Sequence, residues 1–324
     1  MNATHLSDPV LLSRLVVFSI IPFFLIVGLI GNTFVVYIYV RQSQKSNVET
    51  FIFVLAVIDL IGCIFGMPLE MAELYPAIQS NYLCKFYKFI VFICSTISSF
   101  ILFTIAIERF TKICCPLSKQ ITPKLRNSLI IFIIVLSVVL VLPPVLYTEG
   151  VPIFHENKIF MECENVLRGS FLWSYALMAL IVYSILVLST TVLYSFVRKT
   201  INQHLKKKQS KEESSQQERI NLINIKSITQ HLKKKQSEEE ACKQEQINHI
   251  YIVLISISIL YFVSFLPTRV FFVIYPYCKD SNLLQIFKVI SYRSWILNSS
   301  LNPVMYGFCK KTFRKSIVNI FTRD

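Results

Sequence analysis

Residues 298–308 read N-S-S-L-N-P-V-M-Y-G-F and lie at the end of the last apolar run of the chain. Polar side chains are costly inside a membrane unless they are paired, and they usually mark function there. Asn298, Ser299, Asn302 and Tyr306 are among the polar side chains of this stretch. Pro303 lies among them and removes one backbone donor, so the carbonyl four residues earlier loses its partner and the helix is expected to bend. Neighbouring amides can satisfy that carbonyl. We therefore predict a membrane helix with a hinge at Pro303.

The composition is that of a membrane protein. Hydrophobic residues make up 54% of the 324 residues, and there are 26 Phe but only 7 Gly, unlike a soluble domain. Runs of about 20 apolar residues are long enough for a membrane-spanning helix. They occur at residues 12–40, 50–72, 84–113, 125–147, 170–197, 247–275 and 284–307. We predict an all-α membrane protein in which residues 12–307 form a bundle of seven transmembrane helices.

Lysine and arginine are distributed unevenly between the loops. A net charge of +14 would suggest nucleic-acid binding in a soluble protein, but here the basic residues are concentrated on the side that carries Arg41, Lys112, Lys199 and the C-terminus. The positive-inside rule places that side in the cytosol. We expect a multi-pass protein of the plasma membrane with residues 1–11 outside, the C-terminus in the cytoplasm and no nucleic-acid partner. The first run is too long for a cleaved signal peptide and is interpreted as a retained anchor.

This orientation suggests modification and disulfide sites. The sequon Asn2-Ala3-Thr4 lies outside, so Asn2 is a candidate for glycosylation, with a chance match as the alternative. Cys84 starts the third run and Cys163 lies in the loop before the fifth, both on the outer side, where disulfides form. We predict that they are bonded, which would hold the loop over the mouth of the bundle. Cys309 follows the last run on the cytoplasmic side and is a candidate for palmitoylation, with plain packing as the alternative.

Further polar residues lie inside the apolar runs. Asn32 in the first run needs a hydrogen-bond partner on another helix. Asp59 in the second run lies near the middle of the membrane, where a carboxylate must be protonated, paired or bound to a cation. In the third run 25 residues separate Cys84 from Arg109. That distance is roughly 37 Å of helix, which places the cysteine at one membrane surface and Glu108-Arg109-Phe110 at the other.

Taken in order, these motifs resemble those of the rhodopsin-like (class A) G-protein-coupled receptors, and the chain looks like a divergent member of the peptide-receptor type. The resemblance covers residues 12–318 and rests on residues that fall in order on the expected spans: Asn32, Asp59, Cys84, Arg109, Cys163, Pro267 and Asn302-Pro303-x-x-Tyr306. It implies an extracellular ligand, a peptide or neuropeptide, and a heterotrimeric G protein that is activated through outward movement of the sixth helix. Arrestin and membrane lipids are the further partners that it implies.

The resemblance also implies roles for single residues. Coupling to the G protein is assigned to Glu108, Arg109, Phe110, Tyr194 and Tyr306. Glu108 would hold the permanently charged Arg109 inward until activation releases it. The activation hinge is assigned to Phe265, Pro267, Asn302 and Pro303. An allosteric sodium ion is assigned to Asp59, Ser98, Asn298, Ser299 and Asn302, because oxygen ligands suit a hard cation. An Asp59 held neutral by hydrogen bonds is the alternative, and no other cofactor is expected.

Several positions depart from the family pattern. Phe110 and Phe265 replace the usual tyrosine and tryptophan, and the fourth run lacks its usual tryptophan. Ile247 stands where many relatives have a glutamate that restrains Arg109. Elevated basal activity, or a constitutively active orphan receptor, is therefore a hypothesis.

A ligand pocket is expected at the outer mouth of the bundle. Val91 stands where amine receptors have an aspartate, and Ile296 where opsins have the lysine that holds retinal, so neither chemistry fits. The charged and aromatic residues near the mouth are assigned to the pocket together with Val91: Glu70, Glu73, Lys88, Arg269, Tyr292 and Arg293. Residues 158–164 alternate with a period of two, which predicts a hairpin lid.

Three interpretations of these charges stay open. A peptide could offer its carboxyl end to Arg269 and a basic residue to Glu70 or Glu73. A small anionic or lipid-like ligand is the second. The third is an internal ion pair of Glu70 with Arg269 or Arg293, which would involve no ligand.

The long loop 198–246 carries a tandem repeat. I-N-Q-H-L-K-K-K-Q-S from residue 201 returns as I-T-Q-H-L-K-K-K-Q-S from residue 228, 27 residues later (201 to 228). No Pro or Gly interrupts it, so the fifth and sixth helices are expected to extend into the cytosol. A role in G-protein selectivity and a tolerated insertion are the two interpretations. Residues 308–324 predict a short amphipathic helix on the inner leaflet, followed by a short tail.

Other protein classes fit less well. A transporter or channel would be expected to show an inverted repeat, a charged pathway or paired broken helices. The sequence has no metal cluster, nucleophile with base or phosphate loop that would indicate an enzyme. We expect a receptor without enzymatic activity.

Overall fold

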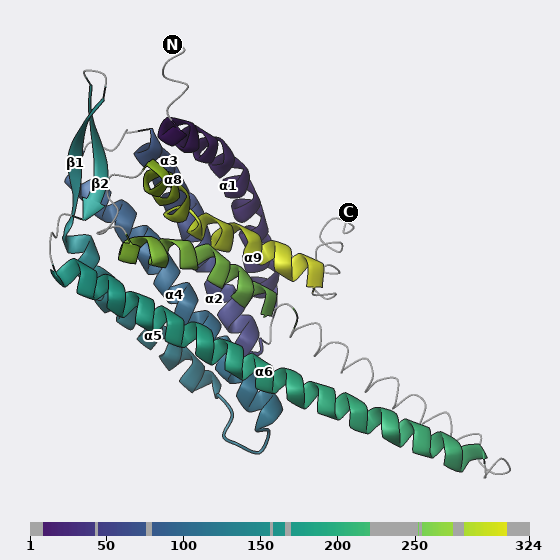
Figure 1. Ribbon diagram of the computed structural model, residues 1–324. Coiled ribbons are helices and arrows are strands. Elements are labelled where there is room, and N and C mark those ends of the chain that lie inside the picture. Colours follow the sequence, from purple (N-terminus) through teal and green to yellow (C-terminus); the bar gives the residue numbers. More distant parts are fainter. Residues whose placement is uncertain are drawn as a thin grey trace.

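The structure is a computed structural model that describes residues 9–42, 45–75, 80–155, 158–165, 170–220, 252, 255–274 and 282–309. Over these residues it is a bundle of long helices with a two-stranded hairpin at one end (Figure 1). We call Ile255–Ile274 the sixth helix. The elements in chain order are α1 (Pro9–Arg41), α2 (Asn47–Ile61), the π-helix η2 (Gly62–Gly66), α3 (Met67–Leu74), α4 (Asn81–Cys114), α5 (Pro123–Leu146), β1 (Thr148–His155), β2 (Lys158–Asn165), α6 (Ser170–Ile220), the sixth helix, α8 (Asn282–Ser291) and α9 (Trp295–Cys309).

Six of the described helices are long and apolar enough to cross a membrane. α2, η2 and α3 together form one of them, Asn47–Leu74, and the six coincide with the first six apolar runs of the sequence. A chain in lipid must satisfy its backbone polar groups internally, and a helix does so within one segment. The seventh run corresponds to α8 and α9. The predicted bundle of seven transmembrane helices is confirmed.

The seventh span is divided, which the sequence did not predict. The sequence places one bend at Pro303, whereas the structure also interrupts the helix at residues 292–294, between α8 and α9. The interruption is a tightened turn with bonds to the third residue back, from Arg293 N to Ile290 O at 3.2 Å and from Ser294 N to Ser291 O at 3.3 Å. The turn orients the Arg293 side chain toward acidic residues of α3, as described below.

The second span contains a π-helix, which the sequence also did not predict. Gly62–Gly66 forms one wide turn between α2 and α3. Pro68, at the start of α3, has no backbone donor, so a regular hydrogen-bond ladder cannot continue through this region. Such wide turns inside helices are frequent at functional sites.

The hairpin is held to α4, the most buried of the spanning helices. β1 and β2 are antiparallel, with Gly150 opposite Cys163. Cys163 is bonded to Cys84 near the start of α4, and the Gly150 N–H donates to Asn81 Oδ1 at 2.9 Å. The predicted disulfide and the predicted hairpin are therefore both confirmed.

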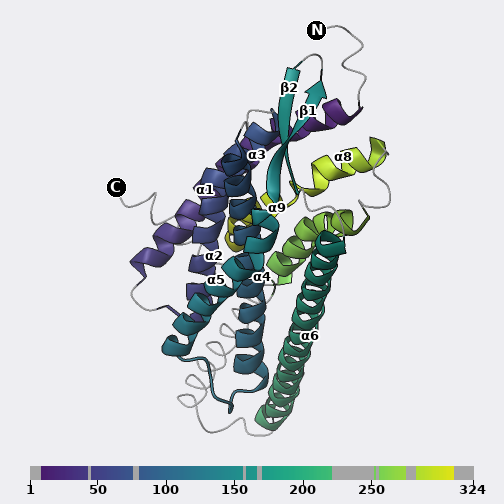
Figure 2. The same ribbon diagram turned by 90° about the vertical axis from the view of Figure 1, so that its left-hand side faces the viewer.

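α6 extends far beyond the apolar run of the fifth span. The run ends at residue 197, and the helix continues to Ile220, through most of the first copy of the repeat. In both views the hairpin lies at the end of the bundle where α1 begins, and α6 runs past the other helices at the opposite end (Figure 2). The predicted extension is confirmed for the fifth helix. The second repeat copy, Ile247, the sequon at Asn2 and the amphipathic helix after residue 309 lie outside the described residues.

Candidate functional site

The backbone carbonyl left free by Pro303 is bonded to Asn32. Asn32 Nδ2 donates to Ser299 O at 2.8 Å and to Gly28 O at 3.0 Å. Ser299 lies four residues before Pro303, so its carbonyl is the one that lacks a helical donor. α1 comes this close because it presents Gly31 to the proline ring: a Cβ at Gly31 would lie 2.6 Å from Pro303 Cβ. The structure thus confirms that Asn32 pairs with another helix and that an amide satisfies the hinge.

Asn32 belongs to a group of buried polar residues that we call the mid-bundle cluster: Asn32, Asp59, Asn298 and Asn302. All four side chains are at most 2% exposed. Asn302 Nδ2 donates to Asp59 Oδ2 at 2.8 Å. Among the described residues, no hydrogen-bond donor reaches Asp59 Oδ1 or the side-chain oxygens of the three asparagines. The cluster therefore contains buried acceptor oxygens that no described residue satisfies.

These oxygens fit the predicted sodium ion. They combine one carboxylate with neutral amide oxygens, and hard cations prefer such ligands. Ser98 and Ser299, the two hydroxyl ligands of the prediction, are buried as well. Asp59 is the one acidic residue among the five residues predicted to bind the ion. A single carboxylate favours a monovalent ion over a divalent one.

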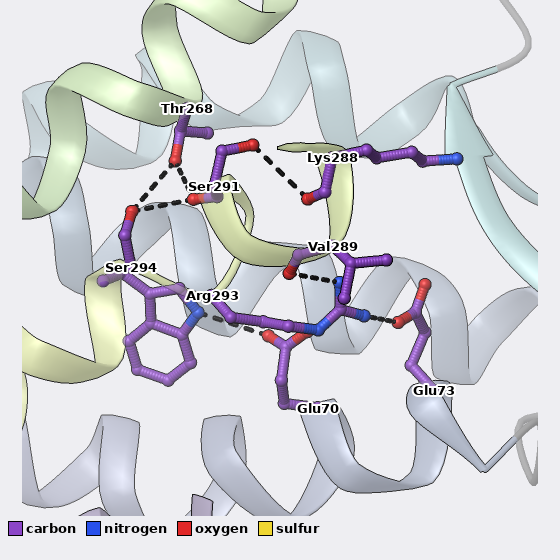
Figure 3. A network of polar contacts seen from close by, with 9 residues as sticks. Glu70, Glu73, Thr268, Lys288, Val289, Ser291, Arg293 and Ser294 are labelled. Atoms are coloured by element: carbon purple, nitrogen blue, oxygen red, sulfur yellow. Dashed lines mark hydrogen bonds and ion pairs between the residues drawn. The ribbon is translucent and has the colours of Figure 1, made fainter. Parts of the chain in front are cut away.

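A second buried group, the outer charge cluster, consists of Glu70, Glu73 and Arg293 (Figure 3). Arg293 Nε lies 3.0 Å from Glu70 Oε1, and Arg293 Nη2 contacts Glu73 Oε2. Arg293 Nη1 also donates to Val289 O at 3.0 Å. All three charged side chains are at most 8% exposed. The internal ion pair that was one of three interpretations of Glu70 is present, and its partner is Arg293.

Trp295 joins this cluster and was missed by sequence reasoning. Its Nε1 donates to Glu70 Oε2 at 3.2 Å. The indole packs on the π-helix so closely that a Cβ at Gly66 would lie 2.7 Å from Trp295 Cη2, and one at Gly62 3.3 Å from Cζ3. The spacing Gly62-x-x-x-Gly66 is the small-residue pattern that lets a partner approach a membrane helix, and it could have indicated this contact.

The turn between α8 and α9 is also bonded to the sixth helix (Figure 3). Thr268 Oγ1 donates to Ser291 O, and Ser294 Oγ donates to Ser264 O. Thr268 directly follows Pro267 in the sequence. Hydrogen bonds therefore connect the sixth helix, next to its proline, with the divided seventh span.

The remaining residues of the predicted ligand pocket lie in two places. Lys88 Nζ lies 4.6 Å from the Tyr87 ring centroid and 5.1 Å from that of Tyr292, beside the outer charge cluster. Val91 is buried one turn further along α4. Arg269 instead lines a cavity between α4, α5, α6 and the sixth helix. Of the residues predicted to form the ligand pocket, Arg269 alone is among the described residues that line this cavity.

Phe265 lies in an aromatic group that connects three helices. Its ring centroid is 4.7 Å from that of Tyr261, whose hydroxyl is hydrogen-bonded to the Ser99 hydroxyl of α4. Tyr183 of α6 donates its hydroxyl to Phe262 O at 2.9 Å. Phe265 precedes Pro267 by two residues, so the predicted hinge of the sixth helix is packed against both α4 and α6.

At the other end of α4, the structure pairs Glu108 with Arg109. Arg109 Nε lies 3.7 Å from Glu108 Oε2, and the Arg109 side chain is 15% exposed. Phe110 meets Phe196 of α6, with ring centroids 6.1 Å apart, and Tyr194 is buried two residues before Phe196. The backbone of Tyr306 belongs to α9. The predicted ion pair is thus formed, with α6 packed beside it.

Almost the whole chain matches one known protein family. Residues 31–306 match the family described as "7 transmembrane receptor (rhodopsin family)". The matched region contains α1 from Gly31 onward and nearly all of α9.

Individual relatives are similar at low identity. The chain is 25% identical to the human cholecystokinin receptor type A over 203 residues, which is 59% of the chain and 47% of that receptor. It is 23% identical to galanin receptor 2b of Danio rerio over 321 residues, 95% of the chain and 74% of the receptor. It is 33% identical to the neuromedin U receptor homolog nmur-2 of Caenorhabditis elegans over 125 residues, 36% of the chain and 31% of that protein. The alignments with cholecystokinin receptors of several mammals span about a third to a half of those receptors, 32% in mouse and 47% in human.

Proposed function

The chain belongs to the rhodopsin family of seven-transmembrane receptors, and on this premise we propose that it binds an extracellular peptide and activates a heterotrimeric G protein. The family consists of receptors rather than enzymes. The relatives that support a peptide ligand are named as receptors for cholecystokinin, galanin and neuromedin U.

The observation that carries the coupling proposal is the Glu108–Arg109 pair at the end of α4. Arginine stays charged at every physiological pH, so an acidic neighbour can hold it in place but cannot neutralise it. α4 also carries Cys84, which ties its other end to the hairpin. One rigid helix therefore connects the proposed ligand side with the proposed coupling side, and release of Arg109 would expose a cation to the G protein.

The proposed movement is an outward swing of the cytoplasmic end of the sixth helix. Pro267 supplies the bend, and the contacts of Phe265 with Tyr261 and of Tyr261 with Ser99 are the ones that a ligand above them would disturb. The hydrogen bond from Ser294 to Ser264 would carry the movement to the seventh span. There Pro303 and Asn302 form the second hinge.

We further propose that Asp59 binds a sodium ion as an allosteric modulator. The unpaired oxygens of the mid-bundle cluster support it. The proposed orientation has the hairpin outside and the C-terminus in the cytoplasm, with the protein in the plasma membrane. It is supported by the basic residues at the ends of the spans that carry Arg41, Lys112 and Lys199. Arrestin and membrane lipids are proposed as further partners.

Second-messenger output in cells tests the coupling. Cyclic AMP and calcium would be measured for the wild type, Arg109→Ala and the control Lys112→Ala, which removes an exposed basic side chain three residues away. The cells would be tested first without ligand and then with a library of short peptides. We expect the wild type and Lys112→Ala to signal and Arg109→Ala not to, at equal surface expression. Output without peptide would report the missing restraint at Ile247. Equal output from all three would contradict the coupling role of Arg109.

A further inference from the structure

The cavity lined by Arg269 has an unusual polar composition. It has a volume of about 110 Å³ and lies between α4, α5, α6 and the sixth helix. Its walls are mostly aromatic and aliphatic, with Phe92, Phe100, Met178 and Phe272 among them. A dry engineered cavity of about 150 Å³ holds one benzene ring, so there is room here for about one ring or one apolar side chain.

Almost every polar side chain of the lining is already satisfied by the protein. Tyr175 donates to Leu140 O at 2.6 Å and Tyr183 to Phe262 O at 2.9 Å. Thr96 donates to Phe92 O at 2.8 Å, and the hydroxyls of Ser99 and Tyr261 bond to each other. None of these groups needs a ligand to complete its hydrogen bonds.

Arg269 is the exception. Its Nε is buried, and the part of the chain that the structure describes offers this nitrogen no hydrogen-bond acceptor. Among the described residues of the lining there is no aspartate or glutamate. A guanidinium in an apolar setting is costly without a counter-charge. The group that this cavity lacks is an anion.

Glu70 and Glu73 do not supply the anion that Arg269 lacks. Glu70 and Glu73 are both bonded to Arg293, so they are committed within the outer charge cluster. A basic group of a ligand would have to break a buried ion pair to reach them, whereas an anionic group at Arg269 breaks nothing.

We propose that this cavity binds an apolar ring or chain that carries a carboxylate or similar anion, with the anion paired to Arg269. The inference rests on the proposed receptor function and specifies the chemistry of its ligand. The carboxyl end of a peptide with an apolar last residue and a fatty acid from the membrane share this chemistry. A ligand that presents a basic group first does not fit.

The test uses a matched pair of probes. N-acetyl-phenylalanine has a ring and a carboxylate, and N-acetyl-phenylalanine amide has the same ring without the charge. Both would be titrated against the purified full-length protein in nanodiscs by saturation-transfer NMR. The proteins are the wild type, Arg269→Gln, Arg269→Lys and Lys85→Gln, which removes a charge from a residue that does not line the cavity. Thermal unfolding of each variant reports whether it is folded.

We expect the wild type and Lys85→Gln to bind the acid at least about tenfold more tightly than the amide, the size of one charged hydrogen bond. Arg269→Gln should bind both probes alike, and Arg269→Lys should keep part of the preference. Equal binding of acid and amide by the wild type, or an undiminished preference in a folded Arg269→Gln, would overturn the proposal. If Arg269→Gln is unfolded, the wild-type comparison and Arg269→Lys still decide it.

Cell signalling distinguishes the two sources of the anion. Peptides ending in Phe or Leu would be applied as free acids and as amides, beside dodecanoic acid. Activation by the peptide acids alone identifies a peptide carboxyl end, and activation by dodecanoic acid alone identifies a lipid acid. Activation by the amides alone would contradict an anionic ligand. Loss of signal in Arg109→Ala tests the G-protein proposal separately, so the two proposals can fail independently.

Discussion

The two buried polar clusters of the bundle differ in how their charges are paired. In the outer charge cluster, one arginine pairs with two carboxylates, and Trp295 donates a further hydrogen bond. In the mid-bundle cluster, one carboxylate has one amide donor, and the remaining side-chain oxygens have no donor among the described residues. Both clusters are almost fully buried.

This difference separates a structural role from a regulatory one. A cluster whose charges are paired fixes the segments that contribute to it, here α3 and the turn between α8 and α9. A cluster with spare acceptors gains stability from any cation or donor that enters, so its occupancy can change with conditions. The outer cluster should therefore tolerate change poorly and respond little to salt. The mid-bundle cluster should tolerate change better and respond more strongly to salt.

The largest effect is expected in the outer charge cluster. Arg293→Met leaves Glu70 and Glu73 buried without their cation, which should cost about 3–5 kcal/mol of stability. Thermal unfolding of the detergent-purified protein measures the loss. The triple variant Glu70→Gln, Glu73→Gln, Arg293→Met removes every charge of the cluster and should recover much of it. If Arg293→Met were as stable as the wild type, Arg293 would not stabilise the outer charge cluster.

A smaller effect is expected where Trp295 supports that cluster. Gly66→Ala places a Cβ 2.7 Å from the indole, and overpacking of this kind should cost about 1–3 kcal/mol. Gly62→Ala is the matched control, because its Cβ would lie 3.3 Å from the same side chain. Unfolding temperatures should fall in the order wild type, Gly62→Ala, Gly66→Ala. The reverse order of the two variants would show that Trp295 does not pack as described.

Sodium should stabilise the mid-bundle cluster selectively. At a sodium concentration ten times its Kd, the wild type should gain about 1.4 kcal/mol over the same concentration of choline. Asp59→Asn should lose this gain, because it removes the single carboxylate of the cluster. Unfolding in NaCl and in choline chloride at equal ionic strength measures it. An equal response to both salts in the wild type would favour an Asp59 held neutral by hydrogen bonds.

The smallest effect is expected at the hinge carbonyl. Asn32→Ala removes the donor to Ser299 O and should cost about 1 kcal/mol, as interhelical hydrogen bonds in membranes do. Thr33→Ala changes the neighbouring, exposed residue and serves as the control. Identical stabilities of the two variants would mean that the carbonyl freed by Pro303 finds another donor.

The sequence was most informative where a residue requires one particular kind of partner inside the membrane. Pro303 frees a carbonyl and Asn32 requires a partner on another helix, and the structure joins the two. Cys84 and Cys163 were predicted to pair because both lie on the same side of the membrane. The alternation in residues 158–164 predicted the hairpin because side-chain direction in a strand follows directly from position.

It was least informative where the outcome depends on how helices rotate against each other. Arg269 and Arg293 are equally plausible partners for Glu70 in the sequence, and only the packing of the turn at residues 292–294 selects Arg293. For the same reason, the sequence did not predict the π-helix at Gly62–Gly66, the position of Trp295 on it or the cavity at Arg269. Apolar periodicity identifies spans but not the angle at which each span faces its neighbours.

The most direct test of the account is nucleotide exchange by purified components. The wild type, Arg109→Ala and Lys112→Ala would be placed in nanodiscs with purified heterotrimeric G proteins of the main subtypes, and binding of a non-hydrolysable GTP analogue would be followed over time. We predict that the wild type and Lys112→Ala accelerate exchange on at least one subtype and that Arg109→Ala does not. Exchange at the rate of empty nanodiscs with every subtype, before and after addition of peptides that activate cells expressing the wild type, would contradict it.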